Sequence, residues 1–300
     1  MRISSNMVPN ILASLQQSQL ALNQALQEVS TGKRVSAPSD DPSASANMVQ
    51  NTIDSGNLDQ YTQNVSTVLS MVQTADSTLS SVVSSLTQAV SLATQGANGT
   101  ASAANRQAIA QQVQGILQGV VSLANISYSG SYLFAGTAST VAPFSADPSS
   151  PSGYSYLGNS GVNSVSIGDS LSVKVNLPGN QIFSGSSVDV LGTLSSLVTA
   201  LQTGTTSDIQ AAGTQLSAAI SYVGQQRVFY ANAETQLNSQ QTYLQKETVT
   251  LSSQATRLVG IDMAEAATDL AQAQTANSAA LAAAAKVLPT TLLNYLSPPQ

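Results

Sequence analysis

Two pairs of acidic side chains are the first candidates for chemistry in this sequence. Asp40 and Asp41 are adjacent in a turn-rich segment, and Asp262 and Glu265 are three residues apart. Paired carboxylates can work as a general acid and base or bind a divalent cation. Both pairs also fit helix N-termini, because Asp41 before Pro42 is a typical start and Asp262 with Glu265 resembles a capping box. We expect helix caps at Asp41, Pro42, Asp262 and Glu265, and no catalytic, cofactor or metal site.

Composition excludes several further classes of function. The sequence has no His and no Cys, so the usual nucleophile triads and zinc sites are unavailable. Gly32-Lys33 resembles the end of a phosphate-binding loop, but Gln27 stands where that motif needs glycine. The formal net charge is −6, with only 9 Lys and Arg residues, which argues against nucleic-acid and membrane-surface partners. We therefore expect a protein that is not an enzyme.

Heptad patterns predict the elements that carry these residues. Residues 7–30 have a coiled-coil-like seam, and residues 42–95 and 102–128 have further helical patterns. A shorter helix is expected around residues 194–201, and residues 207–258 repeat an apolar residue at every seventh position. Arg227 and Glu234 interrupt the alternate positions of that last seam, and we expect them to fix register or to pair. The first seam consists of Val8, Leu12, Leu15, Gln19, Leu22, Leu26 and Val29.

The C-terminal helix, predicted over residues 262–288, has an unusually broad apolar stripe. Residues 279–285 are all Ala or Leu, yet this run is too short for a membrane span. We expect neighbouring subunits to bury it, and Pro289 to mark where the helix stops or bends. The predicted assembly interface consists of Val8, Leu12, Leu15, Leu22, Leu26, Val29, Met263, Ala267, Leu270, Leu281, Ala284 and Leu288.

Residues 129–187 differ from the rest in composition and predict a small β-rich insert. Leu171, Val173, Val175 and Leu177 alternate with polar residues, which is the period of a half-buried strand. Gly168-Asp169 before them suggests a hairpin. The predicted fold is mainly α, a long antiparallel coiled-coil-like rod with this insert. Five segments follow: residues 1–41, 42–128, 129–187, 188–260 and 261–300, of which the first and last are assembly helices.

Several stretches resemble one family. Residues 29–46 (VSTGKRVSAPSDDPSASA) resemble the N-terminal signature of bacterial flagellins, and residues 223–237 (VGQQRVFYANAETQL) resemble their returning rod helix. Residues 127–144 (SYSGSYLFAGTASTVAPF) and 261–296, ending in LLNYL, resemble the hook-filament junction branch of the flagellin superfamily. The resemblance covers essentially the whole chain.

The resemblance implies a function and a set of partners. It implies a structural subunit that forms a ring with copies of itself, between hook-associated protein 1 and the flagellin filament. It also implies a flagellar export chaperone, export by the type III export apparatus without a cleaved signal peptide, and an extracellular location in the flagellum. Terminal segments would form the inner coiled-coil core, with the insert facing outward.

Two other functions remain as alternatives. One is flagellin itself, the filament subunit, and the LFAGT…PF and LLNYL stretches favour the junction branch over it. The other is a secreted adhesin that binds glycans through the Tyr-rich insert. Packing of the aromatic residues in a small β core is the simpler interpretation of that insert.

Overall fold

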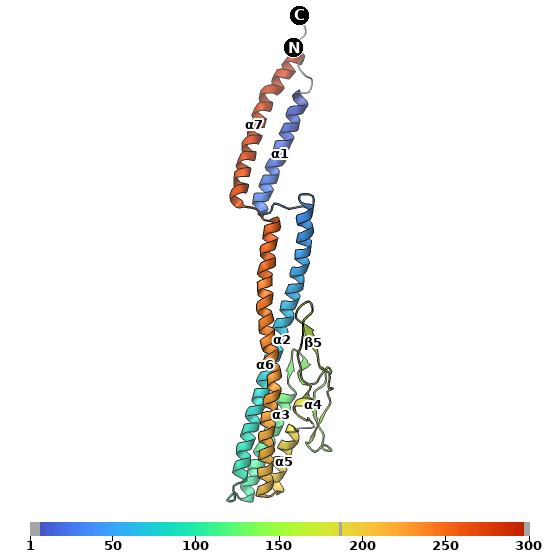
Figure 1. Cartoon of the computed structure of the whole chain (residues 1–300), viewed down its shortest axis with the longest axis vertical. Helices are drawn as coiled ribbons and strands as arrows, with labels where there is room; N and C mark the ends of the chain where they lie inside the picture. Colours follow the sequence, from blue (N-terminus) through green and yellow to red (C-terminus); the bar gives the residue numbers. More distant parts are fainter. Residues whose placement is uncertain (1–6, 186–187, 297–300) are drawn as a thin grey trace. The chain divides into compact units, whose positions relative to one another are not determined.

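A computed structural model describes residues 7–185 and 188–296, and side chains from residue 9 to residue 286 within those ranges. Most of the chain is helical, as predicted (Figure 1). The helices are α1 (Met7–Thr31), α2 (Pro42–Gly96), α3 (Ala103–Ala124), α4 (Gly179–Ile182), α5 (Val190–Thr203), α6 (Thr206–Val259) and α7 (Met263–Leu296).

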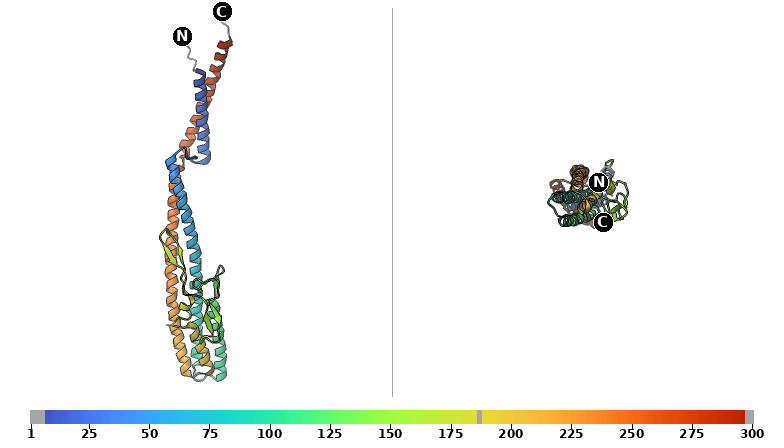
Figure 2. Two further views of the ribbon diagram at one scale, coloured as in Figure 1. Left: turned by 90° about the vertical axis from the view of Figure 1, so that its right-hand side faces the viewer. Right: turned by 90° about the horizontal axis from the view of Figure 1, so that it is seen from below.

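The contacts divide the chain into two compact units. The terminal unit consists of Met1–Asn57 and Glu247–Gln300, and the central unit is Leu58–Lys246. One boundary falls inside α2 and the other inside α6, so neither lies at a helix end. In the terminal unit, α1 and α7 lie side by side (Figures 1 and 2).

Heptad seams build the helical core of the central unit. On α2 the apolar residues at heptad spacing are all buried: Val65, Val68, Val72, Ala75, Leu79, Val82, Leu86, Ala89 and Ala93. The apolar residues at every seventh position of α6 from Ile209 to Leu244 are buried too. Arg227 and Glu234 both pair across to α2. Arg227 makes a bidentate ion pair with Asp76 at 2.8 and 2.9 Å, and Glu234 accepts from Gln73 at 2.9 Å. These pairs run in opposite sequence order, so the two helices are antiparallel.

Helix α3 is shorter than predicted, because it ends at Ala124 and not near residue 128. The side chain of Asn125 pairs with the backbone of Phe144, donating to its carbonyl and accepting from its N–H, both at 2.8 Å. Ser127–Tyr128 then forms a strand instead of a last helical turn. A pairing partner far along the sequence therefore overrides the local helical preference.

The insert consists of three antiparallel strand pairs. They are β1 (Ser127–Tyr128) with β2 (Ser131–Tyr132), β3 (Phe144–Ala146) with β4 (Tyr154–Tyr156), and β5 (Ser164–Ser166) with β6 (Ser172–Lys174). The last pair is the predicted hairpin, with Val165 opposite Val173. Its strands are shorter than the alternation suggested.

Aromatic residues pack inside the insert. Phe134 and Phe144 each contact Phe183 edge to face, with ring centroids 5.4 and 5.7 Å apart. The Tyr156 hydroxyl lies 3.0 Å from the Phe134 carbonyl oxygen and 2.9 Å from the Asn159 carbonyl oxygen, and it can donate to either. These rings and this hydroxyl stabilise the insert itself, as the simpler interpretation of its aromatic content expected.

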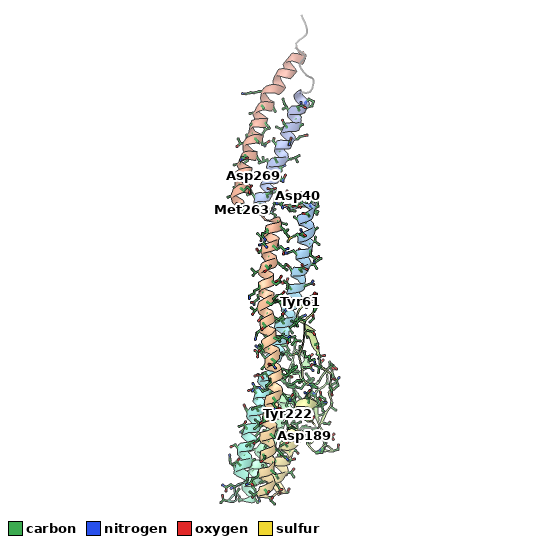
Figure 3. The ribbon with its side chains drawn as sticks, in the orientation of Figure 1. Asp40, Tyr61, Asp189, Tyr222, Met263 and Asp269 are labelled. Carbon is green, nitrogen blue, oxygen red and sulfur yellow. The ribbon has the colours of Figure 1, made fainter. Side chains whose placement is uncertain are left out.

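Three hydrogen bonds link α6 to the insert, and Asn64 on α2 adds a fourth by donating to the Ser166 carbonyl at 2.9 Å. The buried Tyr230 hydroxyl on α6 accepts from the backbone N–H of Leu177 at 3.1 Å. Gln240 donates to the Ile167 carbonyl at 2.9 Å, and Tyr222, labelled in Figure 3, donates to the Gln181 carbonyl at 2.6 Å. The long helix α6 thus positions the insert.

Helix α7 does not stop at Pro289 but continues to Leu296, so of the two predicted alternatives the stop is wrong and the bend stays a prediction. A proline inside a helix removes one backbone hydrogen bond and clashes with the preceding turn, which bends a long helix more readily than it ends it. None of the helices in the described ranges, α7 included, is long and apolar enough to cross a membrane.

Candidate assembly interface

Helices α1 and α7 pack through one heptad seam on each helix. On both helices the less exposed positions recur at steps of four and three, the spacing that keeps one edge of a helix against a partner. On α1 these positions are Ile11, Leu15, Ser18, Leu22, Ala25 and Val29, and on α7 they are Ala266, Leu270, Ala273, Asn277, Ala280 and Ala284.

Some of the predicted interface residues lie on this seam, and others are exposed. Leu15, Leu22, Val29, Leu270 and Ala284 lie on the seam between the two helices. Leu12, Leu26, Ala267 and Leu281 lie beside the seam, and Met263 is exposed three residues before Ala266. The side chains of Val8 and Leu288 lie outside the described residues. The exposed ones are Leu12 (48% exposed), Leu26 (45%), Met263 (54%), Leu281 (48%) and Ala267.

Four of the exposed residues, all but Met263, occupy equivalent positions on both helices. Leu12 and Leu26 each follow a seam residue directly, and so do Ala267 and Leu281. Residues at this position lie beside the seam, and together with it they widen the apolar stripe toward a further neighbour. Each helix therefore carries a second apolar edge, termed here the outer edge: Leu12 and Leu26 on α1, and Ala267 and Leu281 on α7.

A polar pair sits within the seam itself. Ser18 Oγ lies 3.2 Å from Asn277 Oδ1 and donates to it. Polar groups at seam positions specify register, because a shifted pairing would leave them without partners. The sequence analysis missed Ser18 and Ala25, although both fit a seam that begins at Ile11. A search for all heptad registers, polar positions included, would have found them.

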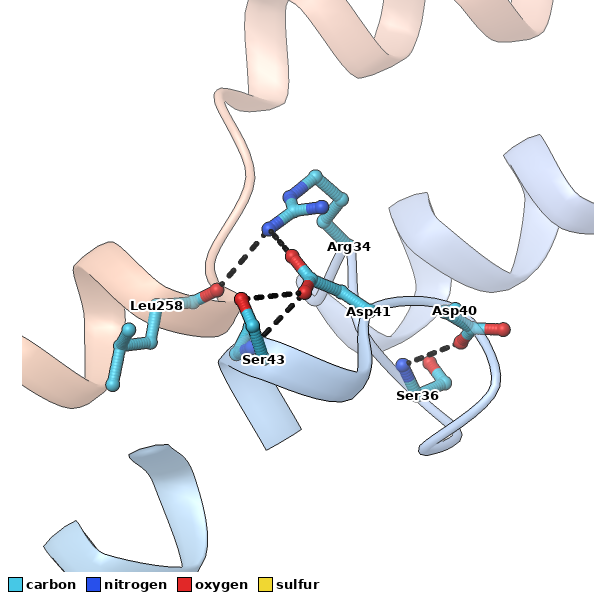
Figure 4. Close-up of polar contacts among 7 residues, drawn as sticks. Arg34, Ser36, Asp40, Asp41, Ser43 and Leu258 are labelled. Atoms are coloured by element: carbon cyan, nitrogen blue, oxygen red, sulfur yellow. Dashed lines mark hydrogen bonds and ion pairs between the residues drawn. The ribbon is translucent and has the colours of Figure 1, made fainter. Parts of the chain in front are cut away.

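Hydrogen bonds of Arg34 hold the connector between α1 and α2, residues 32–41. The backbone N–H of Arg34 donates to the Val259 carbonyl at 2.8 Å. Its guanidinium donates to the Asp41 carboxylate at 3.1 Å and to the Leu258 carbonyl at 3.4 Å (Figure 4). Val35 next to it is buried against Ala44. The connector thereby ties the start of α2 to the end of α6.

Asp41 caps α2, which begins at Pro42. Its carboxylate accepts from the Ala44 N–H at 3.0 Å, and this bond together with the Arg34 pair holds the pKa of Asp41 below its ordinary value. A carboxylate that is engaged in this way has a structural role.

Asp40 closes the turn before α2. It accepts from the backbone N–H groups of Ala37 and Ser36 at 2.8 and 3.0 Å, and these bonds lower the pKa of its carboxyl group. The Asp40 carboxylate is therefore bonded within the turn, and the Asp41 carboxylate is bonded at the start of α2. This agrees with helix capping as the role expected for Asp41.

Asp262 caps α7. Its carboxylate accepts from the Ala264 N–H at 2.8 Å and from the Glu265 N–H at 3.5 Å. Among the described residues, the Glu265 carboxylate makes no return bond to Asp262, so only the first half of the capping box forms. Glu265 instead lies in the first turn, where a negative charge favours the helix dipole.

Family comparison identifies this arrangement of terminal helices. Residues 3–139 match the bacterial flagellin N-terminal helical region, and residues 206–296 match the bacterial flagellin C-terminal helical region. The chain belongs to the bacterial flagellin family. Its family and fold are those of structural components of the flagellum. Residues 140–205, which hold most of the insert, lie between the two matched regions.

Solved structures share the fold. A flagellar hook-associated protein from Vibrio parahaemolyticus has 19% identity and a TM-score of 0.67, over 73% of this chain and 99% of that one. Bacillus cereus FlgL has 22% identity and a TM-score of 0.60, over 69% of this chain and 99% of that one. The flagellar junction protein FlgL from Legionella pneumophila has 14% identity and a TM-score of 0.52, over 73% of this chain and 99% of that one. The comparison with curated proteins gave no match.

Proposed function

We propose that this flagellin-family chain is the subunit that joins hook to filament, a hook-associated protein 3. Copies of it would form a ring between hook-associated protein 1 and the first flagellin subunits. The observation that carries the proposal is the similarity of fold along nearly the whole length of proteins described as hook-associated and junction proteins. The LFAGT…PF and LLNYL stretches favour this assignment over a filament subunit.

The outer edges of α1 and α7 support assembly as the mode of action. Leu12, Leu26 and Leu281 are each nearly half exposed, although their positions repeat with the period of a coiled coil. Apolar side chains aligned in this way on two adjacent helices are typical of a bundle with more than two members. Identical helices from neighbouring subunits would supply the missing members, and folding of the terminal unit would then be coupled to ring formation.

Export and location follow from the same proposal. A ring at the far end of the hook requires passage through the type III export apparatus, with a chaperone shielding the terminal helices beforehand. The exposed leucines of α1 and α7 are the surface that such a chaperone would cover before assembly. The subunit would reach its extracellular site with its N-terminus uncleaved.

Deletion of the gene tests the assignment. Cells without the junction subunit should build hooks that lack filaments and should release flagellin into the medium. Cells without the filament subunit would release no flagellin, which separates the flagellin alternative. Normal filaments on the deletion strain would exclude both flagellar roles. Glycan binding by the purified chain, together with normal filaments, would instead support the adhesin alternative.

A matched pair of variants tests the outer edge. Leu281→Asp should abolish incorporation into flagella while secretion continues, because a charge would be buried between subunits. Thr275→Asp adds the same charge to an exposed polar position of α7 that lies away from the seam and outside the Ala/Leu run, and it should assemble. Motility and electron microscopy of complemented cells provide the measurement. Equal assembly of the two variants would contradict the role of the outer edge.

A further inference from the structure

The turn between α2 and α3 contains Asn98 followed by Gly99, the only Asn-Gly pair in the sequence. Both residues are exposed and lie outside the two helices. We propose that Asn98 is a site of spontaneous deamidation, which converts it to aspartate and isoaspartate. This modification is independent of the junction function.

The reaction needs no partner other than water. The backbone nitrogen of Gly99 attacks the side-chain amide carbon of Asn98 and loses its proton as the new C–N bond forms. The bond from that carbon to Nδ2 breaks, and ammonia leaves with the proton. Water then opens the resulting five-membered succinimide at either carbonyl, which gives aspartate or, with the backbone rerouted through the side chain, isoaspartate.

The geometry of the turn favours the attack. The Asn98 side-chain oxygen accepts from the Thr100 hydroxyl at 3.0 Å and from the Thr100 N–H at 3.3 Å. Donors on this oxygen polarise the carbonyl and stabilise the negative charge that develops on it in the tetrahedral intermediate. The same bonds fold the side chain over the backbone that follows, where the Gly99 nitrogen lies.

Gly99 itself is unobstructed. A side-chain carbon built on it would meet no other atom within 4 Å, so the peptide has room to rotate toward the amide. Within the described turn, the Gly99 N–H makes no hydrogen bond that the attack would have to break. Glycine also has the widest backbone freedom of any residue, which lowers the cost of closing the ring.

Other asparagines of the central unit lack these conditions. Both side-chain atoms of Asn125 are held by Phe144, and a bulky Ile126 follows it. Asn159 also has donors on its oxygen, but its nitrogen donates to Thr137, and Ser160 and not glycine follows it. Asn238 lies inside α6, where the N–H that would attack is part of the helical hydrogen-bond ladder. The structure therefore concentrates the reactivity at one turn.

The modification would alter the turn chemically and conformationally. The Asn98 carbonyl accepts from the Ala101 N–H at 2.9 Å, just before the Ser102 cap of α3. Isoaspartate adds a methylene to the backbone at this point and displaces that carbonyl. Each event also adds one negative charge to a chain of formal charge −6.

Incubation of the full-length protein at neutral and alkaline pH, followed by peptide mass mapping, tests the proposal. We expect a gain of about one mass unit at Asn98 that grows with time and faster at higher pH, because the attacking nitrogen must lose its proton. An isoaspartate-specific methyltransferase should label the same peptide. Asn238 in the same sample is the internal control, and conversion at Asn98 no faster than at Asn238 would overturn the proposal.

Two variants separate the contributions. Gly99→Ala should slow conversion by at least about tenfold, because a β-carbon next to the attacking nitrogen restricts the backbone and hinders ring closure with the neighbouring Asn98. Thr100→Val removes the hydroxyl donor but keeps the N–H, and should slow it by a smaller factor. An unchanged rate in Gly99→Ala would overturn the mechanism, and an unchanged rate in Thr100→Val would overturn the role of the hydroxyl.

Discussion

The central unit buries large side chains, whereas the terminal unit leaves them exposed. The largest fully buried side chains of the described chain, among them Tyr230, Phe134, Leu79 and Leu86, all belong to the central unit. In the described part of the terminal unit, the buried apolar residues are Ala25, Val35, Ala44, Leu251, Val259, Ala266 and Ala284. Its exposed apolar residues include Leu12, Leu20, Leu26, Met263 and Leu281.

From this difference we expect the central unit to fold by itself and the terminal unit to need neighbours. Burial of apolar area contributes about 25 cal/mol per Å², and an alanine seam buries little area per ordered residue. Ordering the backbone costs roughly 1–2 kcal/mol per residue in both units. The central unit offsets that cost with leucine, valine and aromatic side chains. The terminal unit offsets it poorly until other subunits cover its outer edge.

Hydrogen exchange on the monomer should give the largest contrast. We expect amides of α2 and α6 within the central unit to open with free energies that approach the global value, about 5–15 kcal/mol, and amides of α1 and α7 to exchange with free energies near zero. Mass spectrometry of exchanged peptides measures both. Strong protection of residues 7–31 and 263–296 in the monomer would contradict the contrast.

Truncating one leucine in each unit should give the next largest difference. Leu79 is fully buried, so Leu79→Ala should lower the free energy of unfolding by about 2–5 kcal/mol. Leu26→Ala, at a residue 45% exposed, should change it by less than about 0.5 kcal/mol in the monomer. Denaturant titration of both variants gives the values. Similar losses would show that α1 already has a complete core.

Removal of one hydroxyl should have a smaller effect on the central unit. Tyr230→Phe leaves the buried Leu177 N–H without an acceptor and should cost about 1–3 kcal/mol of unfolding free energy. Tyr222→Phe is the control, because it frees the Gln181 carbonyl at a less buried position that water can reach. Thermal unfolding compares them. A larger loss in the control would place the anchor of the insert elsewhere.

The smallest expected effect is that of acid on the connector of the terminal unit, whose hydrogen bonds should weaken at low pH. The pKa values of Asp40 and Asp41 are lowered in the folded chain, so their contribution is complete above the unfolded pKa of about 4 and is lost as the pH falls below it. Exchange at the Ala37 and Ala44 amides, corrected for intrinsic rates, should therefore rise below about pH 4.

The Asp40→Asn variant provides the control for this titration. An asparagine oxygen can still accept from the Ala37 N–H but does not titrate. Its Ala37 amide should lose the acid dependence while Ala44 keeps it. Identical acid profiles in the variant and the unchanged chain would assign the loosening to another group.

The sequence by itself determined the helices and their caps. Apolar residues at every seventh position of α6 predict one buried line, because residues seven apart lie on the same face of a helix. Asp41 before Pro42 fixes the start of α2, because the carboxylate and the locked proline backbone suit a first turn. These are local effects, and neighbouring residues suffice to produce them.

Only the tertiary structure decided which apolar edge of the terminal helices faces inward. Three apolar columns run along residues 263–288 with nearly equal hydrophobicity, so the sequence pattern could not rank them. The fold places Leu270 and Asn277 against α1, where Asn277 meets Ser18, and leaves Leu281 exposed. The tertiary structure also decided two pairings between residues distant in sequence. Arg227 pairs with Asp76, and Asn125 at the end of α3 pairs with Phe144. Spatial neighbours decide between edges of equal apolar character, because burial depends on what lies opposite each edge.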